Sequence, residues 1–197
     1  MDIDVLKNKL SSSVINSSIL LSKSKIFNSY FKETSEYKDN FYFPFYYHLG
    51  FQTNPKKVCQ IGSKLGLIGA CFLQSNKNVE DWIIMDEIEE AVNSSINLIK
   101  SNIKTHSKVN VDCININNSL KNIDMFFDMC MLTDNFSEEK TKIYLEFLWS
   151  HLNKEGLLVI DYIQNGFMKD LFEEFCQIKN RIPVYFKTRY GIGIVTR

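Results

Sequence analysis

Four aspartates stand where an apolar run of the chain ends, and a carboxylate at such a point can do chemistry. Asp86 and Asp161 each close an apolar run, while Asp128 and Asp134 lie at or just past the end of another. A carboxylate at a strand end can accept two neighbouring hydroxyl groups, act as a general base or orient a nucleophile. Two carboxylates brought together could instead bind a divalent cation, which needs several converging oxygen ligands.

The stretch from Val58 to Gly69 joins a short apolar run to a glycine-spaced turn and then to a second apolar run. Gly62 and Gly66 allow the backbone to adopt a positive φ or to approach a ligand closely. The stretch therefore predicts the first strand, ligand loop and first helix of a doubly wound α/β domain, with a small-molecule pocket above the carboxyl end of the strand.

Strands and helices alternate along the rest of the chain, which predicts a mainly parallel sheet with helices on both faces. Two adjacent strands at the end require an antiparallel hairpin at the sheet edge. Ser137 is expected to cap one helix, and Gly156 to terminate that helix or start the next turn. The expected strands are 57–61, 82–86, 109–116, 123–132, 157–161, 184–188 and 191–196, and the helices after the first strand are about 65–74, 88–99, 138–152 and 167–178.

Residues 1–53 are expected to form a helical and aromatic extension before an α/β domain of residues 54–197. The aromatic run Phe41–Gly50 suits a short helix that covers the pocket, in which case Tyr47 and His48 contact the substrate. The alternative is structural, because aromatic side chains before a first strand often pack helices against the sheet, and a lone histidine among them is often a hydrogen-bonded structural residue.

Composition narrows the class of protein. With 197 residues, 45% of them hydrophobic, the chain is long enough for one substantial core. The 23 basic and 23 acidic residues give no net charge, so nothing in the overall charge attracts nucleic acid or an anionic membrane. Apolar stretches fall short of the roughly 20 residues that cross a bilayer, and the N-terminus lacks the pattern of a secretory signal. We expect a cytoplasmic protein without a membrane span.

Cysteine and histidine give no sign of a metal centre. The three histidines show no metal-ligand spacing, and no two cysteines form a Cys-x-x-Cys pair. An odd number of cysteines among apolar neighbours is typical of reduced core residues, and we expect no bound metal. The cysteines are Cys59, Cys71, Cys113, Cys130 and Cys176.

From Asn54 to Arg197 the chain resembles the class I S-adenosylmethionine (SAM)-dependent methyltransferases. The resemblance rests on the order and spacing of several short motifs rather than on any one of them. It implies the strand order 3-2-1-4-5-7-6 with strand 7 antiparallel, SAM as the cofactor, and methyl transfer to an acceptor that the sequence does not identify. The motifs are Val58–Gly66, Ile84–Asp86, Ile123–Asp128, Leu152–Asp161 and Tyr190–Val195.

The resemblance implies a cofactor site made by Gln60, Gly62, Ser63, Gly66 and Asp86. The glycine loop would line the space for the methionine part of SAM, with amides at the helix start facing its carboxylate, and Asp86 would accept the ribose hydroxyls. Two alternatives stay open. The glycines could form a tight turn without a ligand, and Asp86 could cap the helix that follows it.

Asp128 and Asp134 take the positions where methyltransferases commonly place groups that face the substrate, so either could act as a general base. For Asp134 a turn carboxylate or helix cap is the alternative. Asp128 and Asp161 also resemble the pair that holds a divalent cation in catechol-type methyltransferases, but Tyr162 stands where that family has an amide residue.

Two residues depart from the family pattern, and these departures suggest an alternative function. The family usually has an acidic residue at the position of Gln60 and often a glycine at that of Lys64. The alternative is a catalytically inactive methyltransferase-like module for binding or assembly, which contacts a second copy or a larger complex through its N-terminal extension. A nicotinamide-binding fingerprint would fall on Lys64–Gly69, where its first glycine is missing.

Overall fold

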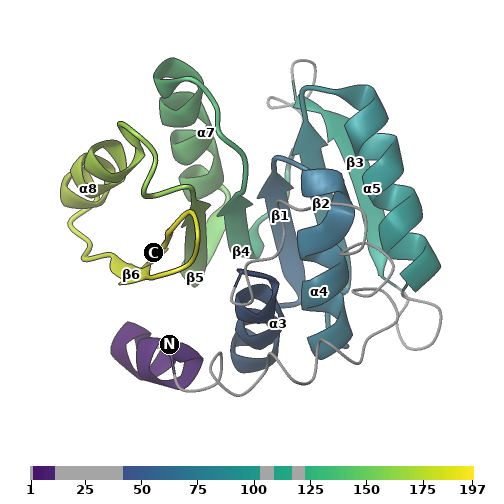
Figure 1. Cartoon of the computed structure of the whole chain (residues 1–197), viewed down its shortest axis with the longest axis horizontal. Helices are drawn as coiled ribbons and strands as arrows, with labels where there is room; N and C mark the ends of the chain where they lie inside the picture. Colours follow the sequence, from purple (N-terminus) through teal and green to yellow (C-terminus); the bar gives the residue numbers. More distant parts are fainter. Residues whose placement is uncertain (1, 12–41, 103–108, 117–122) are drawn as a thin grey trace.

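Seven strands form one sheet in the computed structural model, which describes residues 2–11, 42–102, 109–116 and 123–197 (Figure 1). The strand order is β3-β2-β1-β4-β5-β7-β6, so the predicted order is confirmed. The bounds are β1 Lys57–Ile61, β2 Asp81–Asp86, β3 Asn110–Asn115, β4 Phe127–Leu132, β5 Leu152–Asp161, β6 Val184–Phe186 and β7 Ile192–Thr196.

The pairing directions also agree with the prediction. β1 pairs in parallel with β2 on one side and with β4 on the other. β3 and β5 extend the parallel sheet outward, and β7 runs antiparallel to both β5 and β6. The chain thus reverses its direction of growth between β1 and β4, where open α/β sheets bind ligands.

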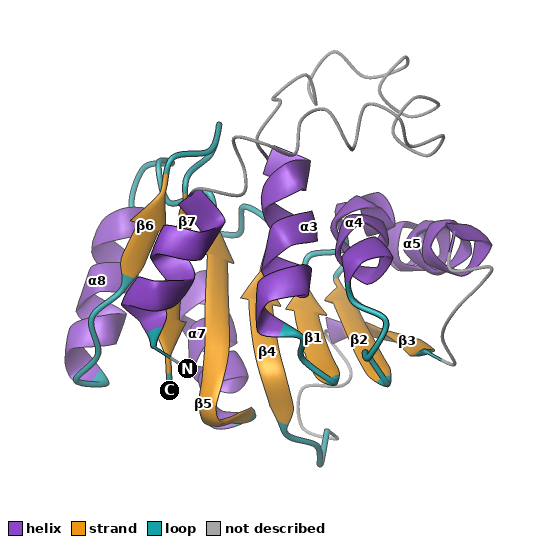
Figure 2. Cartoon of the chain, turned by 90° about the horizontal axis from the view of Figure 1, so that it is seen from below, coloured by secondary structure: helices purple, strands orange, loops and turns teal. Residues whose placement is uncertain are grey.

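Helices cover both faces of the sheet (Figure 2). The helix of residues 3–11 and helices α3, α4 and α5 contribute to the apolar core on one face. Helices α7 and α8 contribute to the core on the other face. The bounds are α3 Tyr42–Thr53, α4 Leu67–Ser75, α5 Glu89–Asn102, α7 Glu138–Ser150 and α8 Met168–Ile178, and a short 3-10 helix of Lys64–Gly66 precedes α4.

Successive strand residues divide between the two cores because side chains alternate across a strand. In β1, Val58 lies in the core beneath α3 and α4, and Cys59 lies in the core beneath α7. In β4, Met129 lies in the same core as Val58, and Cys130 lies in the same core as Cys59. A strand that is buried on both sides needs a continuous apolar run, as the sequence has here.

The boundaries around β4, α7 and β5 differ from the prediction. β4 begins at Phe127 rather than Ile123, so Asp128 is the second residue of the strand. Gly156 lies inside β5 rather than ending α7, which stops at Ser150. The reason is a shift in register between β4 and β5 after Phe127, where β5 makes an excursion that places Glu155 at a φ of +67°.

Helix α3 shares its core with the sheet. It packs beside α4, and its apolar side chains are buried together with those of β1 and β4. We still treat the division into residues 1–53 and 54–197 as a prediction, but α3 contributes to the core of the α/β domain. Its buried apolar residues are Tyr42, Phe43, Phe45, Tyr46 and Leu49. Within the described ranges, no helix combines the length and apolar character needed to span a bilayer.

Candidate functional site

The loops that follow β1, β2, β4 and β5 meet where these parallel strands end. We call this end of the sheet the carboxyl edge, and the opposite end, where the strands begin, the amino edge. The helix after β1 packs on one face and the helix after β4 packs on the other, so the two loops diverge above neighbouring strands. This arrangement makes the crevice in which doubly wound sheets bind ligands.

Both glycines of the first loop adopt a positive φ, +89° at Gly62 and +78° at Gly66. A Cβ atom on Gly62 would lie 2.6 Å from the Cβ of Asp134, and one on Gly66 would lie 2.8 Å from the carbonyl oxygen of Ser95. The missing side chains therefore let the loop pack closely against the loop after β4 and against α5. Close packing within the protein accounts for both glycines before any ligand is considered.

Gln60 is fully buried and holds the first loop in place. Its Nε2 donates to the carbonyl oxygen of Gly62 at 2.7 Å and to Oγ1 of Thr133 at 3.0 Å. Its Oε1 accepts from Nε1 of Trp82 at 3.3 Å. The amide thus joins β1, β2 and the end of β4 through hydrogen bonds to the protein itself.

Asp86 connects the ends of β1 and β2. It is buried, and its Oδ2 accepts the amide of Ser63 at 2.8 Å, while its Oδ1 accepts the amide of Ile88 at 3.2 Å. The second contact closes a turn just before α5, which begins at Glu89, and the first orients the glycine loop. Each carboxylate oxygen can accept a further hydrogen bond, so Asp86 keeps the capacity to bind hydroxyl groups.

Lys64 reaches across the strand ends to two other loops. Its ammonium donates to Oδ1 of Asp134 at 3.1 Å and to the hydroxyl of Tyr162, and it lies 4.4 Å from the centroid of the Tyr162 ring. Only 15% of the Lys64 side chain is exposed, so it does not face solvent. Burial lowers the pKa of Lys64, but the hydrogen bond to Tyr162 and the charge of Asp134 outweigh burial and raise it. Lys64 is therefore a cation at neutral pH.

Asp161 ties the end of β5 to α3. It is fully buried, and burial raises its pKa to about 7 against the lowering effect of the Tyr42 hydrogen bond. The hydroxyls of Tyr42 and Tyr46 both donate to its Oδ2, and the amide of Tyr162 donates to its Oδ1 at 2.8 Å. The side chains of α3 thereby reach the same edge of the sheet as Lys64.

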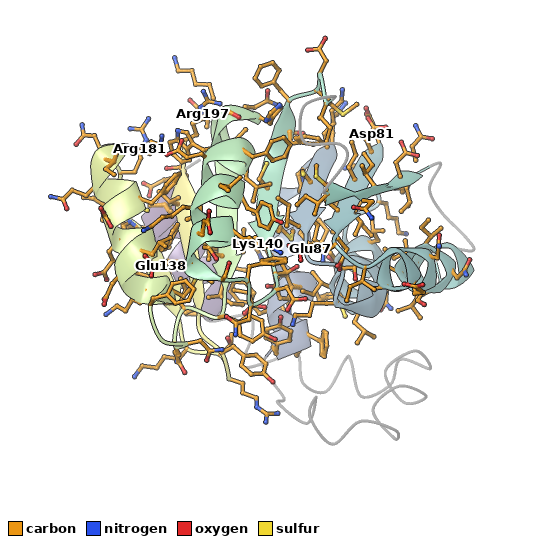
Figure 3. The ribbon with its side chains drawn as sticks, turned by 90° about the horizontal axis from the view of Figure 1, so that it is seen from above. Asp81, Glu87, Glu138, Lys140, Arg181 and Arg197 are labelled. Carbon is orange, nitrogen blue, oxygen red and sulfur yellow. The ribbon has the colours of Figure 1, made fainter. Side chains whose placement is uncertain are left out.

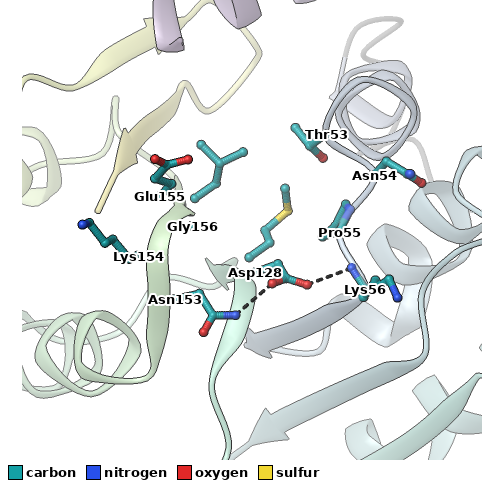
Figure 4. Close-up of a pocket in the computed structure, with 11 residues that line it drawn as sticks. Thr53, Asn54, Pro55, Lys56, Asp128, Asn153, Lys154, Glu155 and Gly156 are labelled. Atoms are coloured by element: carbon teal, nitrogen blue, oxygen red, sulfur yellow. Dashed lines mark hydrogen bonds between the residues drawn. The ribbon is translucent and has the colours of Figure 1, made fainter. Parts of the chain in front are cut away.

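The structure places the two predicted catalytic aspartates at opposite ends of the central strand β4. Asp134 lies two residues past the end of β4, as expected. The structure also places it beside Lys64, which the sequence did not predict. Asp128 lies at the amino edge, where the parallel strands begin. It accepts the amide of Lys56 at 2.9 Å and Nδ2 of Asn153 at 2.8 Å (Figure 4). It also accepts the amide of Lys57 at 3.0 Å. Its expected position at the carboxyl end was wrong, because β4 begins four residues later than the apolar run. There it lines a cavity of about 410 Å³.

The distance along β4 also separates Asp128 from Asp161. Asp161 follows the residue that pairs with Leu132, so it is level with Thr133, five residues beyond Asp128. At about 3.3 Å a residue this separation is roughly 16 Å. The two carboxylates therefore do not form a pair, and the described part of the chain contains no group of three metal-ligating side chains.

Tyr47 and His48 are half-buried on α3. Their rings contact each other with centroids 5.4 Å apart. Burial lowers the pKa of His48, whose buried Nε2 has no hydrogen-bond partner among the described residues. Within the ranges that the structure describes, no hydrogen bond or ring contact joins either residue to Lys64 or Tyr162, so a role in substrate binding stays a prediction.

Sequence reasoning missed the side chains that complete this edge. Tyr162 directly follows a carboxylate at the end of a predicted strand, and this position was a usable signal. Tyr42 and Tyr46 are four residues apart, which places them on one face of a helix. No sequence signal pairs that face with Asp161, more than a hundred positions away.

A second lysine at the carboxyl edge has a different environment. Nζ of Lys140 on α7 donates to both carboxylate oxygens of Glu87 at 2.7 Å, and Glu87 also accepts from the hydroxyl of Tyr144 at 2.8 Å (Figure 3). The Lys140 hydrogen bond lowers the pKa of Glu87. This pair links the loop after β2 to α7 and takes no part in the Lys64 contacts.

No protein-family model matches the sequence, and no curated protein is similar enough in sequence to match it. Solved structures do share its architecture. The O-methyltransferase TomG from Streptomyces achromogenes, in complex with SAM, gives a TM-score of 0.68 at 11% identity over 96% of this chain and 97% of that one.

Two further structures contain S-adenosylhomocysteine (SAH). The methyltransferase PaMTH1 from Podospora anserina gives a TM-score of 0.62 at 11% identity over 98% of this chain and 94% of that one. An O-methyltransferase from Bacillus cereus gives 0.60 at 11% identity over 96% and 91%. The chain has the fold of the class I SAM-dependent methyltransferases.

Proposed function

We propose that this protein transfers the methyl group of SAM to an acceptor molecule that is not yet identified. The fold supports the proposal, since solved methyltransferases with SAM or SAH bound share it over nearly their whole length. The observation that carries it is Asp86, a buried carboxylate that joins the loop after β1 to the end of β2 next to the point where the sheet reverses its order.

The residues at this edge fit an adenosyl ligand. Both Asp86 oxygens retain a lone pair after accepting the amides of Ser63 and Ile88, so Asp86 would hold the two ribose hydroxyls. The backbone of Gly62 and Ser63 would line the methionine part. Gln60 contributes indirectly, because its amide fixes the carbonyl of Gly62, and Gly66 sets the distance between the loop and α5.

The bound cofactor supplies an activated methyl group on a sulfonium, so the protein has to bind, align and exclude water rather than activate the donor. Asp134 is the general base in this proposal. It lies beside the crevice, and its side chain is 41% exposed, so an acceptor can reach it. We retain Tyr47 and His48, half-buried on α3, as proposed substrate contacts.

Isothermal titration of the full chain with SAM and with SAH tests the proposal. We expect heat with both ligands, and Asp86→Asn should weaken binding at least about tenfold, because a hydrogen bond to a charged group contributes roughly 1.5–3 kcal/mol. Asp81→Asn is the matched control, since Asp81 begins the same strand at the opposite edge (Figure 3). It should leave the affinity within about twofold.

The absence of heat with either ligand would overturn the proposal. It would favour a methyltransferase-like module for binding or assembly, and two observations support that second function. Gln60 replaces an acidic residue and has its hydrogen bonds within the protein, and Lys64 brings a cation to the crevice. Light scattering of the full chain discriminates further, since the module predicts a stable oligomer, and an active monomer contradicts it.

A further inference from the structure

Three polar atoms around Lys64 have unused hydrogen-bonding capacity. The Lys64 ammonium carries three N–H groups, of which Asp134 and Tyr162 accept two. Among the described residues, none accepts the third N–H or the hydrogen of the Tyr162 hydroxyl. Oδ1 of Asp134 accepts from Lys64 and from the amide of Asn135, whereas its Oδ2 receives no hydrogen bond from that part of the chain.

This set of groups matches one kind of ligand. Two donors, one of them a cation, suit an oxygen atom that carries negative charge, and a carboxylate oxygen next to them suits the proton of the same hydroxyl. We propose that Lys64 and Tyr162 hold the oxygen of a methyl acceptor with an acidic hydroxyl group, a phenol or an enol, while Oδ2 of Asp134 takes its proton. The inference rests on the proposed methyl transfer and names the acceptor class and the residues that select it.

The backbone supports a functional assignment. Lys64 has a φ of +46° and Tyr162 a φ of +61°, a conformation that residues with a side chain rarely adopt. Both strained residues lie at the carboxyl edge, and their side chains meet there. Strain of this kind persists where the surrounding structure fixes it, and it concentrates at functional sites.

The neighbours of Tyr162 hold its ring in one orientation. The ring stacks on Tyr190 with centroids 4.6 Å apart and planes inclined by 25°. Its backbone amide is bound to Asp161. The hydroxyl therefore has a fixed position next to the ammonium, as a group that aligns an acceptor must have.

The cation increases the fraction of the acceptor that is ionised, and the ionised oxygen is the nucleophile. An opposite charge within about 4–6 Å lowers the pKa of an acidic group by roughly one to three pH units. The hydroxyl proton passes to Asp134 and then to solvent. The acceptor oxygen forms its bond to the methyl carbon as the bond between that carbon and the sulfonium sulfur breaks, and the electron pair of the broken bond stays on the sulfur.

The probe for this inference is 4-nitrophenol, whose ionised form has its own absorption band. The full chain is first saturated with SAH, which cannot donate a methyl group, and the probe is then titrated with alkali in the presence and absence of protein. We expect binding to lower the apparent pKa of the probe by at least about one pH unit. Lys64→Met, which keeps an unbranched side chain but removes the ammonium group, should abolish that shift.

Two further variants complete the test. Tyr162→Phe keeps the stacked ring and removes one donor, so it should reduce the shift without abolishing it. Lys140→Met removes a cation of the same edge that pairs with Glu87, and it should leave the shift unchanged. Circular dichroism identifies any variant that fails to fold. If Lys64→Met does not fold, the Tyr162→Phe result takes its place as the test.

The outcomes separate this inference from the proposed function. A wild-type protein that binds SAH but does not bind the probe, or binds it without a shift, overturns the inference alone. An equal shift in the wild type and in Lys64→Met also overturns it, because the cation then has no effect. A wild-type protein that gives no heat with SAH overturns the methyl transfer and this inference with it.

Discussion

At the amino edge of the sheet, Asp128 accepts three hydrogen bonds that join β1, β4 and β5. At the carboxyl edge, Oδ1 of Asp134 accepts a hydrogen bond from Lys64. Its Oδ2 accepts no hydrogen bond from the described residues. The two aspartates lie six residues apart in sequence at the two ends of β4. Where the protein itself satisfies every polar group, the groups stabilise the fold. Where hydrogen-bonding capacity is left unused, the arrangement fits ligand binding.

The largest effect concerns Asp161, which faces Tyr42, Tyr46, Tyr162 and Lys64. Its pKa is raised from 3.8 to about 7, so the folded state binds more protons than the unfolded state between these values. Stability from this group is fully present below about pH 4 and is lost as the pH rises through 7. The loss is about 4 kcal/mol, at about 1.36 kcal/mol for each pH unit.

Urea unfolding between pH 4 and 8 measures this loss against Asp161→Asn. Asparagine keeps an acceptor for the tyrosine hydroxyls but does not titrate, so its stability should lack this fall with rising pH. Parallel curves for the two proteins would show that Asp161 is ionised at the same pH in the folded and unfolded states.

Replacing Asp128 should have the next largest effect. Asp128→Ala leaves the amides of Lys56 and Lys57 and the side chain of Asn153 without their acceptor, which we expect to cost about 2–4 kcal/mol of unfolding free energy. Asp124→Ala, at an exposed aspartate before β4, is the control and should change stability by less than about 0.5 kcal/mol. An equal loss of unfolding free energy in both variants would show that Asp128 does not stabilise the fold through these hydrogen bonds.

The smallest effect on stability belongs to Tyr162→Phe. No described residue accepts the proton of the hydroxyl, and the ring keeps its stacking on Tyr190, so the cost should stay below about 1 kcal/mol by urea unfolding. A cost near that of Asp128→Ala would mean that the hydroxyl is needed for folding, and the contrast between the two edges would fail.

The sequence predicted those features that depend on periodicity and order. Alternating apolar runs and the hairpin at the end led to the strand order, and Asp86 came out at the end of β2 because its apolar run ends there. Asp128 was misplaced for a physical reason. An apolar run shows that residues are buried but not where hydrogen-bonded pairing begins, and residues 123–126 are apolar in part without belonging to β4.

The long-range contacts of the candidate site were beyond reach for a different reason. Lys64 differs from the family pattern, and a loop lysine is most often solvated, yet here two other loops enclose it. Tyr42 binds Asp161 across 119 positions. Such contacts depend on how loops from separate strands converge, which no local pattern encodes.

Isothermal titration with SAH of the wild type, Asp86→Asn and Asp128→Ala tests the central claim most directly. The carboxyl edge should bind the ligand and the amino edge should only stabilise the fold. We predict heat with the wild type, an affinity at least about tenfold weaker in Asp86→Asn, and an unchanged affinity in folded Asp128→Ala. No heat with the wild type, or an equal loss in both variants, would contradict the account.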